Sequence, residues 1–233
     1  MKLLAIDTST EACSCALYID GEIQNRSVIA PRQHAALILP MADELLQAAD
    51  LKPNQLDVLA FVRGPGSFTG LRITCGVAQG IAFAADIPVI PISSLATLAQ
   101  AANIEYGAKN VLAAIDARMK EIYWGGYRLD NEGIMRCELD EIVCQPEKIS
   151  LPTTGKWYGT GTGWTTYATQ LSTIVGNLLH HYQGERYPQS HAMIPLALAA
   201  FKEGKIESAE NALPVYLRNK VVNIARGNPP GIL

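Results

Sequence analysis

The chain has 233 residues, of which 48% are apolar and 18% charged, so it is globular with a substantial core and is not a disordered protein. Its formal net charge of −3 disfavours a protein that holds a nucleic acid by itself. The 5 cysteines form no CxxC pair and the 4 histidines show no HxxxH or HExxH spacing, which predicts reduced thiols and no metal site. No uninterrupted apolar run reaches the roughly 18 residues of a membrane helix, and the first residues do not form a signal peptide, so we expect a cytoplasmic protein.

Three strands are predicted at the start of the chain. Residues 3–7 form a buried apolar run that ends in Asp7. Residues 13–19 and 23–29 flank Asp20-Gly21, which is a strong hairpin signal. The sequence therefore predicts three strands, of which the second and third form a hairpin.

Helices and strands alternate in the next part of the chain. We expect helices over residues 33–49, 70–85 and 94–102, separated by strands over residues 56–62 and 89–92. Pro40 predicts a kink or a restart in the first of these helices. Three strands followed by alternating helices and strands predict an α/β unit with a mixed sheet.

The same pattern then begins again. Residues 111–116 form a second apolar strand that ends in Asp116, and residues 122–127 and 134–143 are the strands on either side of a turn at residues 130–133. Apolar strands that end in Asp are common, so chance is the alternative, but the shared strand order favours an internal duplication.

The end of the chain is less regular. GTGTG at residues 159–163 does not match the GxGxxG spacing of dinucleotide-binding proteins. After it we expect helices over residues 165–181 and 194–201 and an extended segment over residues 212–217.

A glycine-rich turn at residues 64–70 is the most distinctive stretch of the sequence. Thr69 is the predicted cap of the helix that follows, and free N–H groups at a helix start can bind a phosphate. Asp7 ends a strand beside hydroxyl residues, an arrangement that can hold Mg²⁺ and phosphate oxygens. The alternative is a turn that satisfies only its own backbone. The candidate phosphate or nucleotide residues are Asp7, Thr8, Ser9, Gly64, Gly66 and Ser67.

The helix after this turn carries small residues at every fourth position, namely Gly76, Gly80 and Ala84. Residues with this spacing share one face of a helix, and small side chains permit a second helix to approach closely. The face is either a docking surface or part of the chain's own core. His34 is expected at the surface or as a cap at the start of the earlier helix.

Five motifs, spread over nearly the whole chain, resemble the TsaB (YeaZ) family: IDTST, HAALILPMADELL, RGPGSFTGLRI, IDARMKEIYW and PVYLRNKV. The resemblance implies the actin/hexokinase/Hsp70-type α/β fold, with two RNase H-like halves of which the second is degenerate. It divides the chain into a first domain over residues 1–105, a second over residues 106–217, and a tail over residues 218–233.

The resemblance also implies a function. TsaB proteins are subunits of the machinery that forms threonylcarbamoyladenosine (t6A) beside the anticodon of tRNA, with the transferase TsaD and the ATPase TsaE. The metal-binding His pair of TsaD falls near Ser94 and Leu98 here, so the resemblance implies a non-catalytic, metal-free subunit and argues against a peptidase.

The remaining implications concern partners. The resemblance implies a heterodimer with TsaD, a homodimer in its absence, and contact with tRNA only through the complex. ATP or ADP would sit at a site shared with partners, and the rival interpretation is a kinase or ATPase that uses Mg-ATP. The expected partner interface comprises Leu37, Met41, Leu45, Arg72, Gly76, Gly80 and Ala84.

Overall fold

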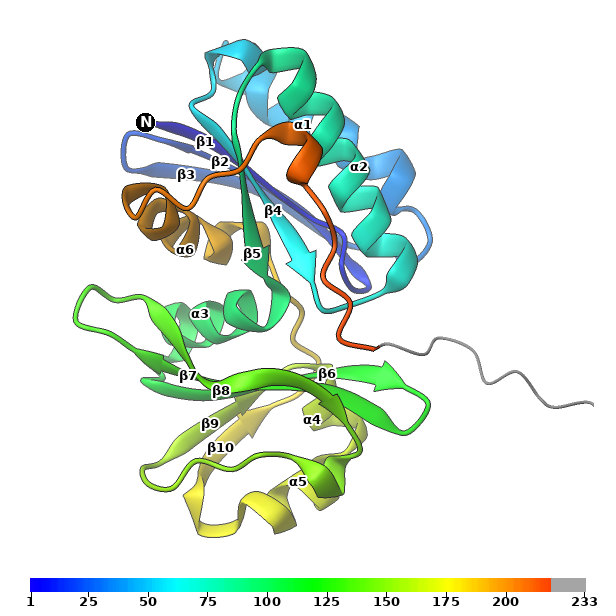
Figure 1. Ribbon diagram of the computed structural model, residues 1–233, viewed down its shortest axis with the longest axis vertical. Helices are drawn as coiled ribbons and strands as arrows, with labels where there is room; N and C mark the ends of the chain where they lie inside the picture. The colour runs from blue at the N-terminus through cyan, green and yellow to red at the C-terminus, as the bar shows by residue number, and fades with distance from the viewer. Residues whose placement is uncertain (219–233) are drawn as a thin grey trace, which may run out of the picture.

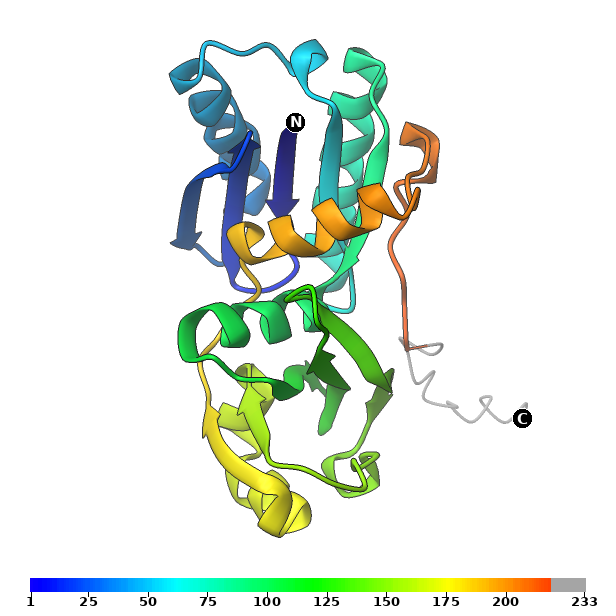
Figure 2. The same cartoon turned by 90° about the vertical axis from the view of Figure 1, so that its left-hand side faces the viewer.

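The computed structural model describes residues 1–218 and shows two lobes, each built on a five-stranded mixed sheet (Figures 1 and 2). The first sheet has the order β3-β2-β1-β4-β5, in which the first three strands are antiparallel and β4 and β5 run parallel to β1. Its strands are β1 (Lys2–Asp7), β2 (Ala12–Ile19), β3 (Glu22–Ile29), β4 (Val58–Gly64) and β5 (Val89–Ser93).

The second sheet repeats this topology in the order β8-β7-β6-β9-β10. Its strands are β6 (Asn110–Arg118), β7 (Glu121–Leu129), β8 (Met135–Cys144), β9 (Trp157–Thr160) and β10 (Leu179–Gln183). The predicted duplication is therefore present strand for strand, and the second sheet is complete. Its degeneracy is confined to the helices, because only the short helix η2 (Pro146–Lys148) lies between β8 and β9, where the first lobe has α1.

Helices cover both faces of each sheet (Figure 1). In the first lobe, α1 (His34–Ala48) and α2 (Phe68–Ala85) pack on one face. In the second lobe, α4 (Thr162–Thr166) and α5 (Ala168–Val175) occupy the equivalent face. The remaining short helices are η1 (Pro53–Gln55), η3 (Gly176–Leu178) and η4 (Ala209–Asn211).

The last helix of each half packs on the sheet of the other half. The helix α3 (Ser94–Tyr106) follows β5, yet Leu95 and Leu98 belong to the core formed with β6 and β7. The helix α6 (Ser190–Lys202) follows β10, yet Met193 and Ala197 pack against the first sheet. The two lobes therefore exchange their final helices, which lie together between the sheets (Figure 2).

This exchange differs from the division of the chain expected from sequence. Residues 106–217 do not form one unit, because α6 completes the core of the first lobe and the segment after it stays there. The backbone of Glu207 pairs with Val89, and the N–H of Val215 donates to the carbonyl of Arg63 at 2.8 Å. The predicted extended segment at residues 212–217 follows this path without forming a strand. Of the predicted tail, only Arg218 lies within the described residues.

Two further predictions need correction. The expected helix over residues 165–181 is wrong, because Gly176, with φ +55°, ends α5 and residues 179–183 pair with β9 as β10. The cap of α2 is Ser67, whose hydroxyl accepts from the N–H of Gly70, rather than Thr69. By contrast, α1 continues through Pro40.

The helix α2 has 18 residues with a mean hydropathy of 1.2, so among residues 1–218 it alone is long and apolar enough to cross a membrane. It packs along β4 and buries Leu71, Cys75 and Ala78 in the first lobe. We therefore interpret α2 as a core helix whose outer side is also apolar.

Candidate functional sites

Each lobe carries an aspartate in a turn at the end of its first strand. The Oδ1 atom of Asp7 accepts from the N–H of Ser9 at 2.7 Å, and the Oδ1 atom of Asp116 accepts from the N–H of Arg118 at 2.8 Å. The duplication therefore extends to the hydrogen bonds of the two turns, which face each other across the gap between the lobes.

The glycine-rich turns bring helix starts against these strand ends. A Cβ at Gly66 would lie 2.5 Å from the carbonyl oxygen of Ser9, and one at Gly70 would lie 2.0 Å from that of Thr8. In the second lobe, a Cβ at Gly161 would lie 2.2 Å from the carbonyl oxygen of Ala114. These glycines are thus explained by close contact within the chain itself, without any need for a phosphate.

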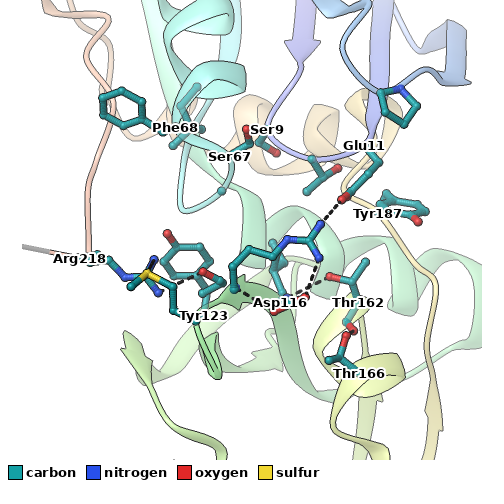
Figure 3. Close-up of a pocket in the computed structure, with 18 of the residues that line it drawn as sticks. Ser9, Glu11, Ser67, Phe68, Asp116, Tyr123, Thr162, Thr166, Tyr187 and Arg218 are labelled. Carbon is teal, nitrogen blue, oxygen red and sulfur yellow. Dashed lines mark hydrogen bonds and ion pairs between the residues drawn. The ribbon is translucent and has the colours of Figure 1, made fainter. Parts of the chain in front are cut away.

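A cleft of about 610 Å³ lies between the lobes (Figure 3). Its walls come from both halves and include Ser9, Ser67, Phe68, Asp116, Thr162 and Tyr187. Of the six predicted phosphate residues, Ser9, Gly66 and Ser67 line this cleft. Gly64 instead packs near the carbonyl oxygen of Val215, and Asp7 and Thr8 are buried below the cleft wall.

Asp7 is 1% exposed. Desolvation by burial raises the pKa of its carboxyl from 3.8 to about 6, although the hydrogen bond from Ser9 acts in the opposite direction. Its Oδ2 atom has no hydrogen-bond partner within residues 1–218. Thr8 is similarly withdrawn, since its hydroxyl donates to the carbonyl of Gly70 and contacts the Thr74 hydroxyl at 2.6 Å. Neither side chain is presented to a ligand in the cleft.

Charges in the cleft largely neutralise one another. The guanidinium of Arg118 contacts Glu11 of the first lobe at 2.9 Å and Asp116 of the second at 3.1 Å (Figure 3). Arg218 donates to the carbonyl of Ala117 at 3.0 Å and pairs with Glu121. Cations that are already paired with carboxylates leave little free positive charge for a polyphosphate.

No group of three side chains from His, Cys, Asp or Glu is placed to hold a metal ion in the part of the chain that the structure describes. Ser94 and Leu98, near which the family resemblance places the His pair of TsaD, are buried in the packing of α3. A metal centre at these two positions would require different side chains.

His34 does not lie at the surface, contrary to the expectation from sequence. It is 8% exposed and lines the cleft at the start of α1, and its Nε2 atom has no hydrogen-bond partner among the described residues. The helical spacing of His34, Ile38, Met41 and Leu45, which are all buried, is the sequence signal that could have placed it on the inner face.

The small-residue face of α2 is exposed. A Cβ added at Gly76 or Gly80 would meet no atom within 4 Å. These glycines and Ala84 line a groove of about 660 Å³ between α2 and the segment at Lys52 and Pro53. Its remaining walls are mostly apolar and include Leu39, Val77 and Ile81.

Exposed apolar side chains lie on the two helices beside this groove. Phe83 of α2 is 83% exposed and Leu39 of α1 is 50% exposed. Both were missed from sequence, where neither the periodicity nor the resemblance singled them out. We call this surface, formed by Leu39, Gly76, Val77, Gly80, Ile81, Phe83 and Ala84, the α2 face.

The predicted contribution of α1 to a partner interface needs correction. Met41 and Leu45 are 8% and 0% exposed and belong to the core of the first lobe, and Leu37 packs against that core. Leu39 is the large apolar side chain that α1 exposes instead. Arg72 is exposed near the start of α2, where its guanidinium lies 4.0 Å from the ring centroid of Phe68.

Two lobes with duplicated mixed sheets, final helices between them and a cleft at the strand ends define the actin/hexokinase/Hsp70-type class of proteins. The family model that matches residues 27–225 is described as tRNA N6-adenosine threonylcarbamoyltransferase, TsaD. The particular family follows from the curated relatives, which carry the name tRNA threonylcarbamoyladenosine biosynthesis protein TsaB.

The relative from Escherichia coli K12 is 44% identical over 225 residues, covering 95% of this chain and 96% of that protein. The relative from Haemophilus influenzae is 42% identical, covering 95% of both chains. The solved structure of YeaZ from Pseudomonas aeruginosa superposes with a TM-score of 0.88 at 45% identity, covering 93% of this chain and 99% of that one. The chain belongs to the TsaB (YeaZ) family, as its motifs predicted.

Proposed function

We propose that this chain is a non-catalytic subunit of the machinery that forms t6A on the adenosine 3′ of the anticodon, and that it binds and positions a TsaD-type transferase. The ATPase TsaE would join the same assembly, in the cytoplasm. The family name supports the pathway, and the exposed α2 face is the observation that carries the docking role.

The α2 face has the properties of a helix-docking surface. Its glycines point into open space, so packing inside the chain's own lobe does not explain them. Glycine in a helix interior costs about 1 kcal/mol relative to alanine, so three small residues in register indicate a backbone that another helix approaches. Exposed apolar side chains around them, with Phe83 and Leu39 the most prominent, supply the area that association would bury.

The transfer chemistry would reside on the partner. Residues 1–218 hold no three-residue metal cluster, and Ser94 and Leu98, near which the family resemblance places the His pair of TsaD, are buried. We further propose that ATP or ADP is held only at a site shared with partners, that tRNA is engaged through the complex, and that two copies pair through the α2 face when the transferase is absent.

A bulky residue on the α2 face tests the proposal. Gly80→Trp should fold normally, because the added side chain enters open space, and should abolish co-elution with the co-expressed transferase in gel filtration. t6A formation in the reconstituted reaction should fall with it, because the transferase is no longer positioned.

Thr169→Trp on α5 is the matched control, because it places the same side chain at an exposed helical position of the second lobe. It should leave both co-elution and t6A formation unchanged. Intact complexes with Gly80→Trp would refute docking through this face.

A further inference from the structure

Three rings form a continuous strip along the outer edge of the second sheet, and none of them lines the cleft or the α2 groove. Tyr106 ends α3, Tyr158 lies on β9, and His181 lies on the edge strand β10. The rings of Tyr106 and Tyr158 stack with centroids 5.4 Å apart and planes at 19°, and those of Tyr158 and His181 lie 5.6 Å apart. We call these three residues the aromatic strip.

The three rings of the strip are partly exposed to solvent. Tyr106 is 41% exposed, His181 is exposed and Tyr158 is half-buried. The neighbouring Tyr182 is 38% exposed, and its ring lies between that of His181, with centroids 6.3 Å apart, and that of the buried Trp164, with centroids 5.5 Å apart. Both aromatic rings of β10 are therefore accessible from outside, although Tyr182 also covers Trp164.

Cations surround the strip on a chain whose net charge is negative. The guanidinium of Arg186 lies 5.3 Å from the ring centroid of Tyr106 and pairs with Glu105 at 3.3 Å. Lys109 and Lys156 immediately precede the parallel neighbours β6 and β9, so both lie at the same end of the sheet as Tyr158. The Lys156 ammonium donates to the carbonyl of Asn177 at 2.7 Å.

We infer that the aromatic strip binds an unstacked base of single-stranded RNA, with Lys109 and Lys156 close to the adjoining phosphates. Proteins recognise unpaired RNA bases by stacking them on Tyr, His and Arg planes within a positively charged surface, and both elements are present here. The inference rests on the proposed t6A function, in which the substrate is a tRNA with unpaired loop bases. The acidic chain as a whole would make the contact weak outside the complex.

The test uses the full chain and a fluorescein-labelled 12-nucleotide single-stranded RNA, with anisotropy measured at low ionic strength, where charge contacts are least screened. Tyr106→Ala should weaken binding roughly tenfold, because stacking on an aromatic ring is lost. Tyr106→Phe keeps the ring and should bind within about twofold of the unchanged chain. An abasic oligonucleotide of equal length should bind as weakly as the RNA binds to Tyr106→Ala.

The outcomes separate this inference from the docking role. Equal binding of the abasic and the base-containing probe, or unchanged binding by Tyr106→Ala, would overturn the stacking site. Gly80→Trp should bind the RNA normally while losing the transferase. A chain that docks the transferase and shows no effect of Tyr106→Ala would therefore refute the strip and leave the proposed function standing.

Discussion

Asp7 and Asp116 occupy equivalent turns, yet their environments differ. Asp7 is fully enclosed and its carboxyl has a pKa near 6, whereas the Asp116 carboxylate faces the cleft and pairs with Arg118. The two turns therefore share their backbone geometry but differ in electrostatics: the carboxyl of Asp7 is desolvated, and that of Asp116 is paired with a cation. For this reason the sequence repeat, by itself, did not predict which aspartate could reach a ligand.

Asp7→Asn should stabilise the fold, relative to the unchanged chain, more at high pH than at low pH. A carboxyl whose folded pKa is raised from 3.8 to about 6 stabilises the fold fully below about pH 4, and this contribution is lost as the pH rises through 6. Above that range the ionised group costs about 3 kcal/mol relative to acid conditions. Urea unfolding should show the gain from Asp7→Asn growing by about 1 kcal/mol or more between about pH 5 and about pH 8.

Asp50→Asn provides the comparison, because Asp50 is exposed at the end of α1 and no burial acts on it. The change of the free energy of unfolding with pH should be larger for Asp7→Asn than for Asp50→Asn, because only Asp7 is buried. A pH-independent effect of Asp7→Asn would mean that Asp7 keeps an ordinary pKa in the folded protein.

The roles of some single residues could not be predicted from the sequence. Thr69 was the predicted cap of α2, whereas Ser67 is the actual cap, because the helix begins at Phe68, two residues before the predicted start. The glycines at positions 66 and 70 were recognised as special. Their cause, contact with the strand end that carries Thr8 and Ser9, depends on tertiary packing.

At the scale of elements, α6 shows why the domain boundary could not be drawn from sequence. Its apolar residues predicted a helix correctly, but nothing in their spacing says which sheet they cover. Ser190 at its start donates to the carbonyl of Ser14 on β2 at 2.9 Å, and their hydroxyls contact each other. These contacts join residues 176 positions apart.

Met193→Ala tests the assignment of α6 to the first lobe. Met193 is fully buried against the first sheet, and truncation of such a side chain costs about 2–5 kcal/mol. Hydrogen exchange should therefore accelerate at the amides of β1 and β2 and the urea midpoint should fall. Lys202→Ala, an exposed change on the same helix, should alter neither. Faster exchange confined to β9 and β10 would instead place α6 with the second lobe.

Long apolar segments were easier to predict than short ones. The strands β1, β4 and β6 were predicted because their apolar runs are continuous and buried on both sides. The strand β10 was missed because LHHYQ carries histidines and a glutamine, which its position at an exposed edge permits. The same edge position makes His181 available to the aromatic strip.

For the molecule as a whole, the interlobe cleft should not bind nucleotide strongly without partners. Glu11, Arg118 and Asp116 form ion pairs across it, and the buried Asp7 is not presented to a magnesium ion. Calorimetry with Mg-ATP and with Mg-ADP should give no saturable heat with the isolated chain, and metal analysis should find less than one ion per chain. Micromolar binding of Mg-ATP would favour the kinase or ATPase interpretation.

The exchange of final helices has a consequence for the order in which the protein is made. The ribosome releases the strands of the first sheet early, but the helix that covers their second face begins at Ser190, after all the strands of the second sheet. That face of the first sheet is not covered until α6 has been synthesised. It carries Leu3, Ala5 and Val58, which are completely buried in the folded protein. The lobe that is synthesised first is therefore completed last, after every strand of the second lobe has been made.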